Sequence, residues 1–147
     1  MLRSMTLSRR VLLATMTASA LIAAKALATM SCGSKNPQLT VCASLLSNGA
    51  NPDLATLYDT IMGSASVTNN TTTLQTPTVF ITITAPNGMS TTLFNEVVPI
   101  PAGQTASLSD SWTVGTTWPT DPGKYVGRVQ ATNANGTSSA EAIIAVY

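Results

Sequence analysis

Histidine is absent from this chain of 147 residues, and its absence removes much of the familiar catalytic chemistry. A nucleophile of the triad type needs a histidine as its general base, and imidazole is a main ligand of zinc and blue-copper sites. The carboxylates show no pairing either, because Asp53 and Asp59 are six positions apart and would point in different directions from a helix. We therefore predict that the protein is not an enzyme and has no catalytic residues, metal or cofactor.

Charged residues are also scarce, at 9% of the sequence, and they are unevenly distributed. Four of the seven cations, Arg3, Arg9, Arg10 and Lys25, lie in the first 25 residues. If this segment is removed, three cations remain against six acids, and the net charge becomes −3. A nucleic-acid surface needs a stripe of cations that neutralises phosphates. Nucleic acid is therefore excluded as a partner.

The first residues have the anatomy of a cleavable export signal. Arg3, Arg9 and Arg10 precede an uncharged apolar run over residues 11–24, and small residues at 26 and 28 supply a cleavage site before Thr29. As a helix the run would be about 21 Å long, too short for the roughly 30 Å hydrocarbon core of a bilayer. We therefore assign residues 1–28 to a signal peptide and expect membrane contact only through this signal.

The adjacent Arg9 and Arg10 also bear on the export route. The segment SRRVLL at residues 8–13 resembles the motif of the twin-arginine pathway, which exports folded proteins, and Lys25 before the cleavage site is typical of the same class. An ordinary secretory signal with two arginines adjacent by chance is the alternative. Either route predicts a periplasmic, secreted or cell-surface location.

Both cysteines of the chain, Cys32 and Cys42, fall in the mature part. In an oxidising compartment such a pair is most simply a disulfide, which would stabilise the fold by under about 3 kcal/mol. Lipidation of Cys32 is the alternative, although residues 29–32 lack the aliphatic residue that usually stands three positions before a lipidated cysteine. We expect the disulfide.

Short runs of alternating threonine, valine and isoleucine fill the chain beyond residue 67, with proline and glycine turns between them. This pattern is typical of antiparallel strands. About seven strands in antiparallel succession predict an all-β protein, an immunoglobulin-like antiparallel β-sandwich. The expected strands cover residues 38–43, 64–68, 78–85, 91–98, 105–114, 124–132 and 139–146.

One short helix is predicted near residues 52–62. Asn51 is a suitable N-cap, Pro52 fits the first helical position, and the apolar residues that follow have helical spacing. These apolar residues are Leu54, Leu57, Tyr58 and Ile61. The mature chain is then divided into residues 29–60, with an N-terminal strand, the disulfide and the helix, and residues 61–147, with the sandwich.

The strand expected over residues 105–114 contains a conflict. Leu108 and Trp112 fall on its core face, and Asp110 falls between them on the same face. A bulge, an edge position or a hydrogen bond to a turn would each accommodate the acid. We predict a structural role for Trp112 in the core.

Several short motifs within residues 61–146 resemble the adhesion-related, CARDB-like immunoglobulin-like domains of bacterial and archaeal surface proteins. The motifs are VTN at 67–69, PAGQ at 101–104, SW at 111–112 and PGKY at 122–125. The resemblance implies a sandwich in which the hydroxyl of Tyr125 bonds back to the backbone at a corner. It also implies a non-enzymatic module used for surface attachment or as a spacer.

Two places in the sequence are candidate interaction surfaces. Trp118 lies in a Thr-Trp-Pro loop that would expose its ring, and the outer face of the last strand shows Ile143, Ala145 and Tyr147. Burial of that outer face under the predicted helix is the alternative.

Together these features favour an exported, non-catalytic binding or adhesion module of the cell envelope. The expected partner is an envelope protein, a surface polymer or another copy of the chain. One alternative is a structural subunit that self-assembles by strand addition, with residues 29–43 as the donated strand. The other is an accessory or inhibitor subunit of a periplasmic enzyme, which would travel folded with its partner through the twin-arginine pathway.

Overall fold

The structure is a computed structural model that describes residues 30–115 and 121–147. The predicted signal, with Arg9 and Arg10, and the candidate surface residue Trp118 lie outside the described residues. All of the described residues belong to the predicted mature part of the chain.

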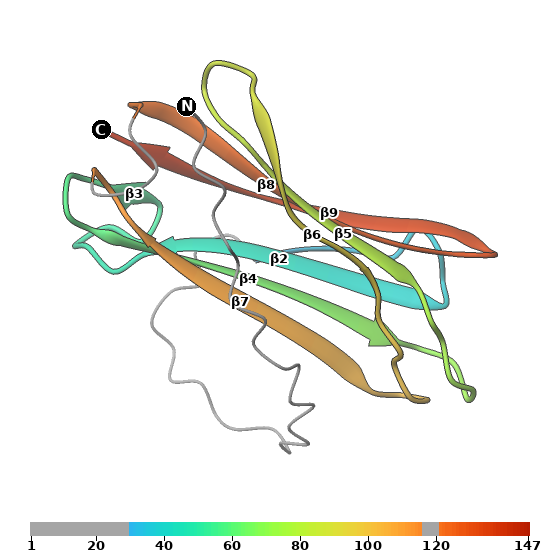
Figure 1. Cartoon of the computed structure of the whole chain (residues 1–147). Helices are drawn as coiled ribbons and strands as arrows, with labels where there is room; N and C mark the ends of the chain where they lie inside the picture. The colour runs from blue at the N-terminus through green and yellow to red at the C-terminus, as the bar shows by residue number, and fades with distance from the viewer. Residues whose placement is uncertain (1–29, 116–120) are drawn as a thin grey trace.

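Pairing of the alternating segments, antiparallel except between β3 and β9, produces two sheets that face each other (Figure 1). The first sheet has the order β1-β2-β4-β7, with strands β1 (Ser31–Gly33), β2 (Leu39–Ser47), β4 (Thr60–Asn69) and β7 (Thr105–Thr113). The second has the order β3-β9-β8-β5-β6, with β3 (Leu54–Ala55), β9 (Gly136–Val146), β8 (Gly123–Asn133), β5 (Thr78–Thr84) and β6 (Ser90–Val97). The predicted all-β sandwich is confirmed, with nine strands in the described residues rather than about seven.

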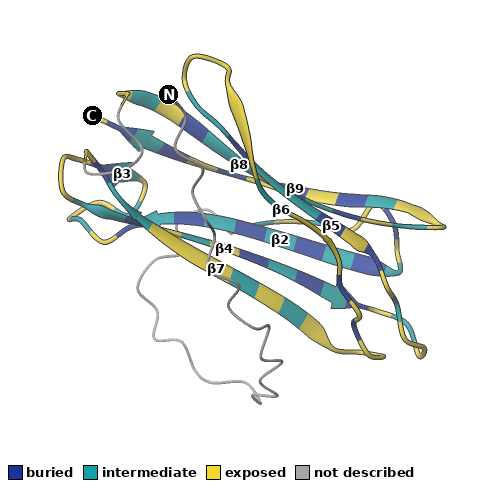
Figure 2. Cartoon of the chain, in the orientation of Figure 1, coloured by how far each residue is buried: buried dark blue, intermediate teal, exposed yellow. Residues whose placement is uncertain are grey.

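Alternate residues of each strand fill the space between the sheets, because successive side chains of a strand point to opposite faces. Every second side chain of β2 from Leu39 to Ser47 is buried, as is every second one of β9 from Ser138 to Val146. Figure 2 shows this as alternating buried and more exposed bands along the strands. The largest fully buried apolar side chains are Tyr125, Leu39, Ile61, Ile100 and Ile144.

The predicted helix near residues 52–62 is wrong. The segment contains the two-residue strand β3 and a turn, and β4 begins at Thr60. Leu57 and Tyr58 are 57% and 71% exposed, whereas Ile61 is 1% exposed, so the supposed apolar face does not exist. A helix of about this length is marginal by itself. Pairing of β3 with β9 and of Ile61 with Trp112 gives the backbone better partners.

The predicted disulfide is present. Cys32 on β1 and Cys42 on β2 are directly opposite each other, with their Cα atoms 4.1 Å apart, and their sulfur atoms are bonded. The Sγ atom that lipidation of Cys32 would use takes part in this bond. The disulfide therefore fastens the three-residue strand β1 to β2, which itself lies between β1 and β4.

Buried asparagines hold the loops at the end of the sandwich where β4 finishes. The side-chain nitrogen of Asn69 donates to the carbonyl oxygens of Thr73, Ile100 and Pro101, and its side-chain oxygen accepts from the backbone and hydroxyl of Thr71. Asn69 is 0% exposed. Every polar atom of this buried amide thus has a partner, as a buried amide requires.

Candidate functional site

The predicted interaction surface on β9 contains two exposed side chains. Ile143 is 41% exposed and Tyr147 is 76% exposed, whereas Ala145 is half-buried. The amide of Ala145 donates to the carbonyl of Asp53, and the amide of Tyr147 donates to that of Ala55. The short strand β3 and its flanks therefore occupy the backbone edge of β9 at its C-terminal end.

Tyr125 lies at the corner that the resemblance implied. Its side chain is 1% exposed, and its hydroxyl donates to the carbonyl oxygen of Asp121 at 2.9 Å. Burial raises the pKa of the Tyr125 phenol, because the ionised form would lose its hydration. The residue fixes the entry to β8.

Trp112 lies on the inner face of β7, opposite Ile61, and its indole covers Gly63 on β4. A Cβ atom at position 63 would lie 2.9 Å from two carbons of the indole ring, so only glycine leaves room for it. The ring packs against the core, as predicted, but it is only half-buried.

A hollow of about 130 Å³ lies between the sheets and is bounded by the edge strands β6 and β7. Its large apolar side chains are Leu45, Ile81, Ile83, Leu93, Phe94, Leu108 and Trp112. Leu45 and Ile83 are buried, and the others are half-buried. Sequence patterns did not predict this hollow, because it forms where strands far apart in the sequence meet.

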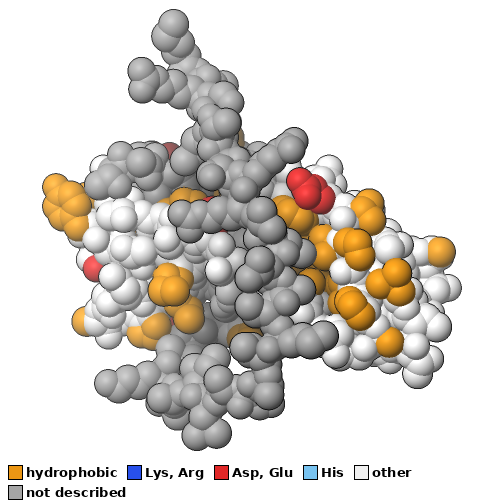
Figure 3. Space-filling view, turned by 60° about the horizontal axis from the view of Figure 1, so that its bottom comes forward, with side chains coloured by type: hydrophobic (Ala, Val, Ile, Leu, Met, Phe, Trp, Pro, Cys, Tyr) orange, Lys and Arg blue, Asp and Glu red, His pale blue; other side chains and the backbone are white. Residues whose placement is uncertain are grey.

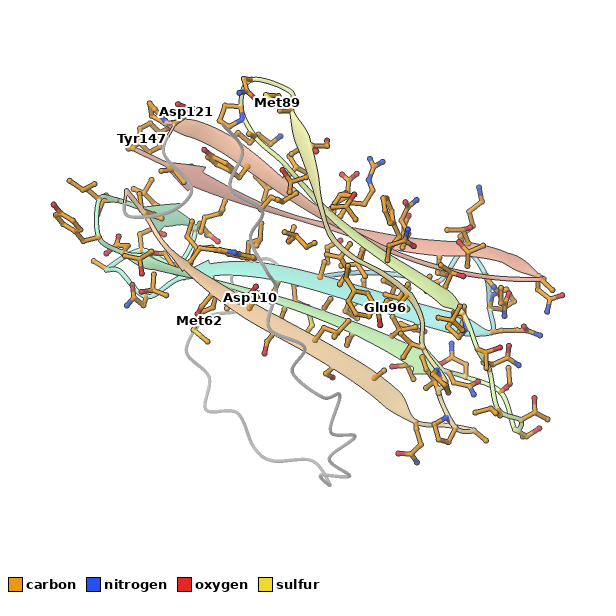
Figure 4. The ribbon with its side chains drawn as sticks, in the orientation of Figure 1. Met62, Met89, Glu96, Asp110, Asp121 and Tyr147 are labelled. Atoms are coloured by element: carbon orange, nitrogen blue, oxygen red, sulfur yellow. A yellow bond between two sulfur atoms is a disulfide. The ribbon has the colours of Figure 1, made fainter. Side chains whose placement is uncertain are left out.

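Asp110 lines the hollow from the inner face of β7, opposite Gly63. Because β7 is an edge strand, the carboxylate is exposed, and it accepts a hydrogen bond from the backbone nitrogen of Ser111 at 2.8 Å. An edge position thus accommodates the acid that conflicted with the sequence pattern. Glu96 is the corresponding exposed acid on the other edge strand, β6, opposite the buried Val79 (Figure 4).

Most outer positions of β2, β4 and β7 are serine or threonine, and we call this surface the hydroxyl face; the other outer residues are Cys42, Leu46 and Met62, of which Met62 is exposed. Ser44, Ser64 and Ser109 lie side by side across the three strands, and the hydroxyl oxygens of Ser44 and Ser64 are 2.5 Å apart. Thr68 and Thr105 are joined in the same way at 2.8 Å. The hydroxyl residues of this face are Thr40, Ser44, Thr60, Ser64, Ser66, Thr68, Thr105, Ser107, Ser109, Ser111 and Thr113.

No outer position of β2, β4 or β7 carries a charged side chain. Figure 3 looks at this side of the molecule, and where grey residues do not cover it the surface is largely uncharged, with isolated acidic groups and no lysine or arginine in view. The second sheet differs, because Lys124 and Arg128 project from β8 and Arg128 forms an ion pair with Glu141 on β9. The two outer faces of the sandwich therefore have different chemistry.

Asp59 is held by hydrogen bonds within the turn between β3 and β4. Hydrogen bonds from the backbone nitrogen and the hydroxyl of Thr56 hold the pKa of Asp59 below its usual value.

Within residues 30–115 and 121–147, no three side chains of the kinds that ligate metals are grouped to hold an ion. No helix in the same residues is long and apolar enough to cross a membrane.

Comparison with solved structures identifies the architecture. Part of an alkylpurine DNA glycosylase from Pseudomonas fluorescens matches with a TM-score of 0.54 and 16% identity, over 75% of this chain and 30% of that one. The chain is an immunoglobulin-like β-sandwich. A β-glucosidase from Erythrobacter marinus matches with a TM-score of 0.50 and 14% identity, over 74% of this chain and 16% of the enzyme.

The CARDB domain from Pyrococcus furiosus also matches, with a TM-score of 0.49 and 20% identity over 74% of this chain and 94% of that domain. No protein-family model and no curated protein matches the chain. The sandwich spans less than a third of the glycosylase and of the glucosidase, at 30% and 16%. The likeness therefore concerns the fold of one part of each enzyme.

Proposed function

We propose that the protein is an exported, non-catalytic binding module of the cell envelope, and that its hydroxyl face contacts a neutral polysaccharide of the cell surface. The observation that carries the proposal is the hydroxyl face, in which rows of serine and threonine run across β2, β4 and β7 without a charge. A paired sheet holds these rows in fixed register. The face is thus a rigid array of neutral hydrogen-bonding groups.

The chemistry of this array favours a sugar polymer over other partners. A hydroxyl both donates and accepts, so it can bond to sugar hydroxyls in either orientation. Its rows repeat about every 4.8 Å across the strands, which suits a partner with a repeating structure. Protein interfaces instead concentrate aromatic residues, arginine and methionine, and of these the outer positions of β2, β4 and β7 have a single methionine, Met62.

Export places the module where such a polymer occurs. A disulfide such as Cys32–Cys42 persists in oxidising compartments outside the cytoplasm. The signal anatomy of residues 1–28 supports the same location, and the twin-arginine route is part of the proposal.

Retention of the oxidised protein on isolated cell-surface polysaccharide tests this function. Ser107→Arg puts a large charged side chain on the exposed part of the hydroxyl face, and we expect it to lose retention. Ser139→Arg is the matched control, because Ser139 is an exposed serine on the outer face of the other sheet. Absence of retention of the unmodified protein, or equal losses in the two variants, would contradict the proposal.

The two other functions stay predictions with less support. In self-assembly by strand addition, the predicted donor segment 29–43 would have to give up its last part, residues 39–43, from β2 in the interior of the first sheet. An incoming strand would also meet β3 on β9, or the inward acids of β6 and β7. An accessory or inhibitor role would gain support if the gene lay beside that of a periplasmic enzyme.

A further inference from the structure

The apolar wall of the hollow is left partly uncovered by the rest of the described chain. Trp112, Phe94 and Leu108 are half-buried, whereas Val41 and Ile144 in the closed part of the core are at most 1% exposed. The volume of the hollow, about 130 Å³, is close to the roughly 150 Å³ of a protein cavity that holds one benzene molecule. The hollow thus has room for one compact apolar group.

An acid stands on each of the two edge strands that bound the hollow. Asp110 lines it from β7, and Glu96 is the next inner position beyond Phe94 on β6. Neither forms an ion pair with a described lysine or arginine, because Arg128, which also lines the hollow, is paired with Glu141. The hollow is therefore lined by one carboxylate, that of Asp110, which has no paired cation among the described residues, and Glu96 lies one inner position beyond its lining.

Aromatic rings beside a carboxylate are the groups that recognise organic cations. The face of an indole or phenyl ring attracts an ammonium group, and a carboxylate adds direct attraction between opposite charges. We propose that the hollow binds a compact organic cation, an ammonium group that carries methyl groups or a short apolar chain. Trp112 and Phe94 contact the apolar part and the cation, and Asp110 faces its charge.

Other occupants fit these surroundings less well. A neutral apolar molecule would remove water from the carboxylate of Asp110 and give nothing in return. A metal ion needs several oxygen ligands close together, and the described residues contain no such cluster. A strand from another chain would meet inward-pointing charge on both edges.

Choline and its neutral isostere 3,3-dimethylbutan-1-ol test the proposal, because they have nearly the same shape and differ in charge. Each is titrated into the oxidised protein while NMR chemical shifts report on the residues that line the hollow. We expect choline to bind about five- to tenfold more tightly than the isostere. The shifts should be centred on Trp112 and Phe94.

Two variants assign the effect to the hollow. Asp110→Asn should bring the affinities for choline and the isostere close together, whereas Asp121→Asn removes the same charge from an exposed turn outside the hollow and should leave their ratio unchanged. Circular dichroism checks that both variants are folded. The proposal is overturned if choline does not bind, if both ligands bind equally to the unmodified protein, or if the two variants change the ratio equally.

Discussion

The buried amide of Asn69 joins the loop that follows β4 to residues 100–101 at one end of the sandwich. Asn69→Ala would leave three backbone carbonyls without this donor, in a place that is 0% exposed. We expect the free energy of unfolding to fall by about 2–4 kcal/mol. Urea denaturation measures this loss.

The adjacent Asn70 supplies the control for Asn69. Its side chain is exposed, and it bonds to the carbonyl of Pro37 and the hydroxyl of Thr40 where water can replace it. Asn70→Ala should cost less than about 1 kcal/mol. Equal losses in the two variants would show that the burial of Asn69 does not increase the contribution of its hydrogen bonds to the free energy of unfolding.

Gly63 and Trp112 form a pair in which the size of one residue fixes the position of the other. A methyl group at position 63 would lie 2.9 Å from the indole, so Gly63→Ala should destabilise the protein by about 1–3 kcal/mol. In a background that already contains Trp112→Leu, the added cost should be much smaller, because the ring that clashes is gone. Additive losses in this double-mutant cycle would contradict the contact.

The turn between β3 and β4 links stability to acid pH through Asp59. Because hydrogen bonds from Thr56 lower the pKa of the folded carboxyl below its usual 3.8, the stabilisation is present above pH 3.8 and is lost as the pH falls through the folded pKa. We expect the urea midpoint to decline on acidification below pH 3.8, and to decline less steeply in Asp59→Asn.

Thr56→Val refines the test of this turn. It removes the hydroxyl donor to Asp59 and keeps the backbone donor, so its acid dependence should lie between those of the unmodified protein and Asp59→Asn. A variant whose midpoint follows the unmodified protein at every pH would argue against the hydroxyl bond.

The disulfide acts on one element, the short strand β1. Replacing both cysteines with serine should lower the free energy of unfolding by up to about 3 kcal/mol, because the unfolded chain regains the freedom of a small loop. The remaining strands do not depend on the bond, so the variant should still fold. Amide hydrogen exchange in residues 31–33 should be faster in the variant, and unchanged exchange there would contradict this account.

At the scale of elements, the sequence predicted the strands that have clear alternation and failed where pairing depends on distant residues. β5, β7 and β9 lie where alternation placed them, because each packs one face against the other sheet, largely buried in β5 and β9 and half-buried in β7. A helix was predicted where β3 lies, since Asn51 and Pro52 are good starting signals and nothing nearby encodes the parallel partner of β3 on β9. Two residues are too few to show a period.

For the whole molecule, the acids on the edge strands should oppose association between copies. Glu96→Val together with Asp110→Val would make both edges apolar on their inner side, and we expect concentration-dependent assembly by light scattering. Asp53→Val with Asp121→Val is the matched control, because it removes the same charge at exposed positions outside the edge strands, and it should stay monomeric. If both double variants behave alike, lower net charge is sufficient to explain association.

The candidate sites were predictable to different degrees. The structural roles of Trp112 and Tyr125 followed from register and from the PGKY motif. The hollow and the hydroxyl face did not, because each combines strands that only the sandwich brings together. Asp110 was the available signal, since an acid on a core face indicates that this part of the core is open.

The loop before β2 and the strand β9 are joined by bonds between residues 102 positions apart. The amide of Asn36 donates to the Ser138 hydroxyl, and that hydroxyl lies within bonding distance of the carbonyls of Asn36 and Leu39. Residues near Asn36 therefore lack their hydrogen-bond partners until β9 has been synthesised, and the sandwich cannot close while β9 is still on the ribosome. On the proposed twin-arginine route, which carries folded proteins, the export machinery would therefore receive the sandwich only after synthesis of the whole chain is complete.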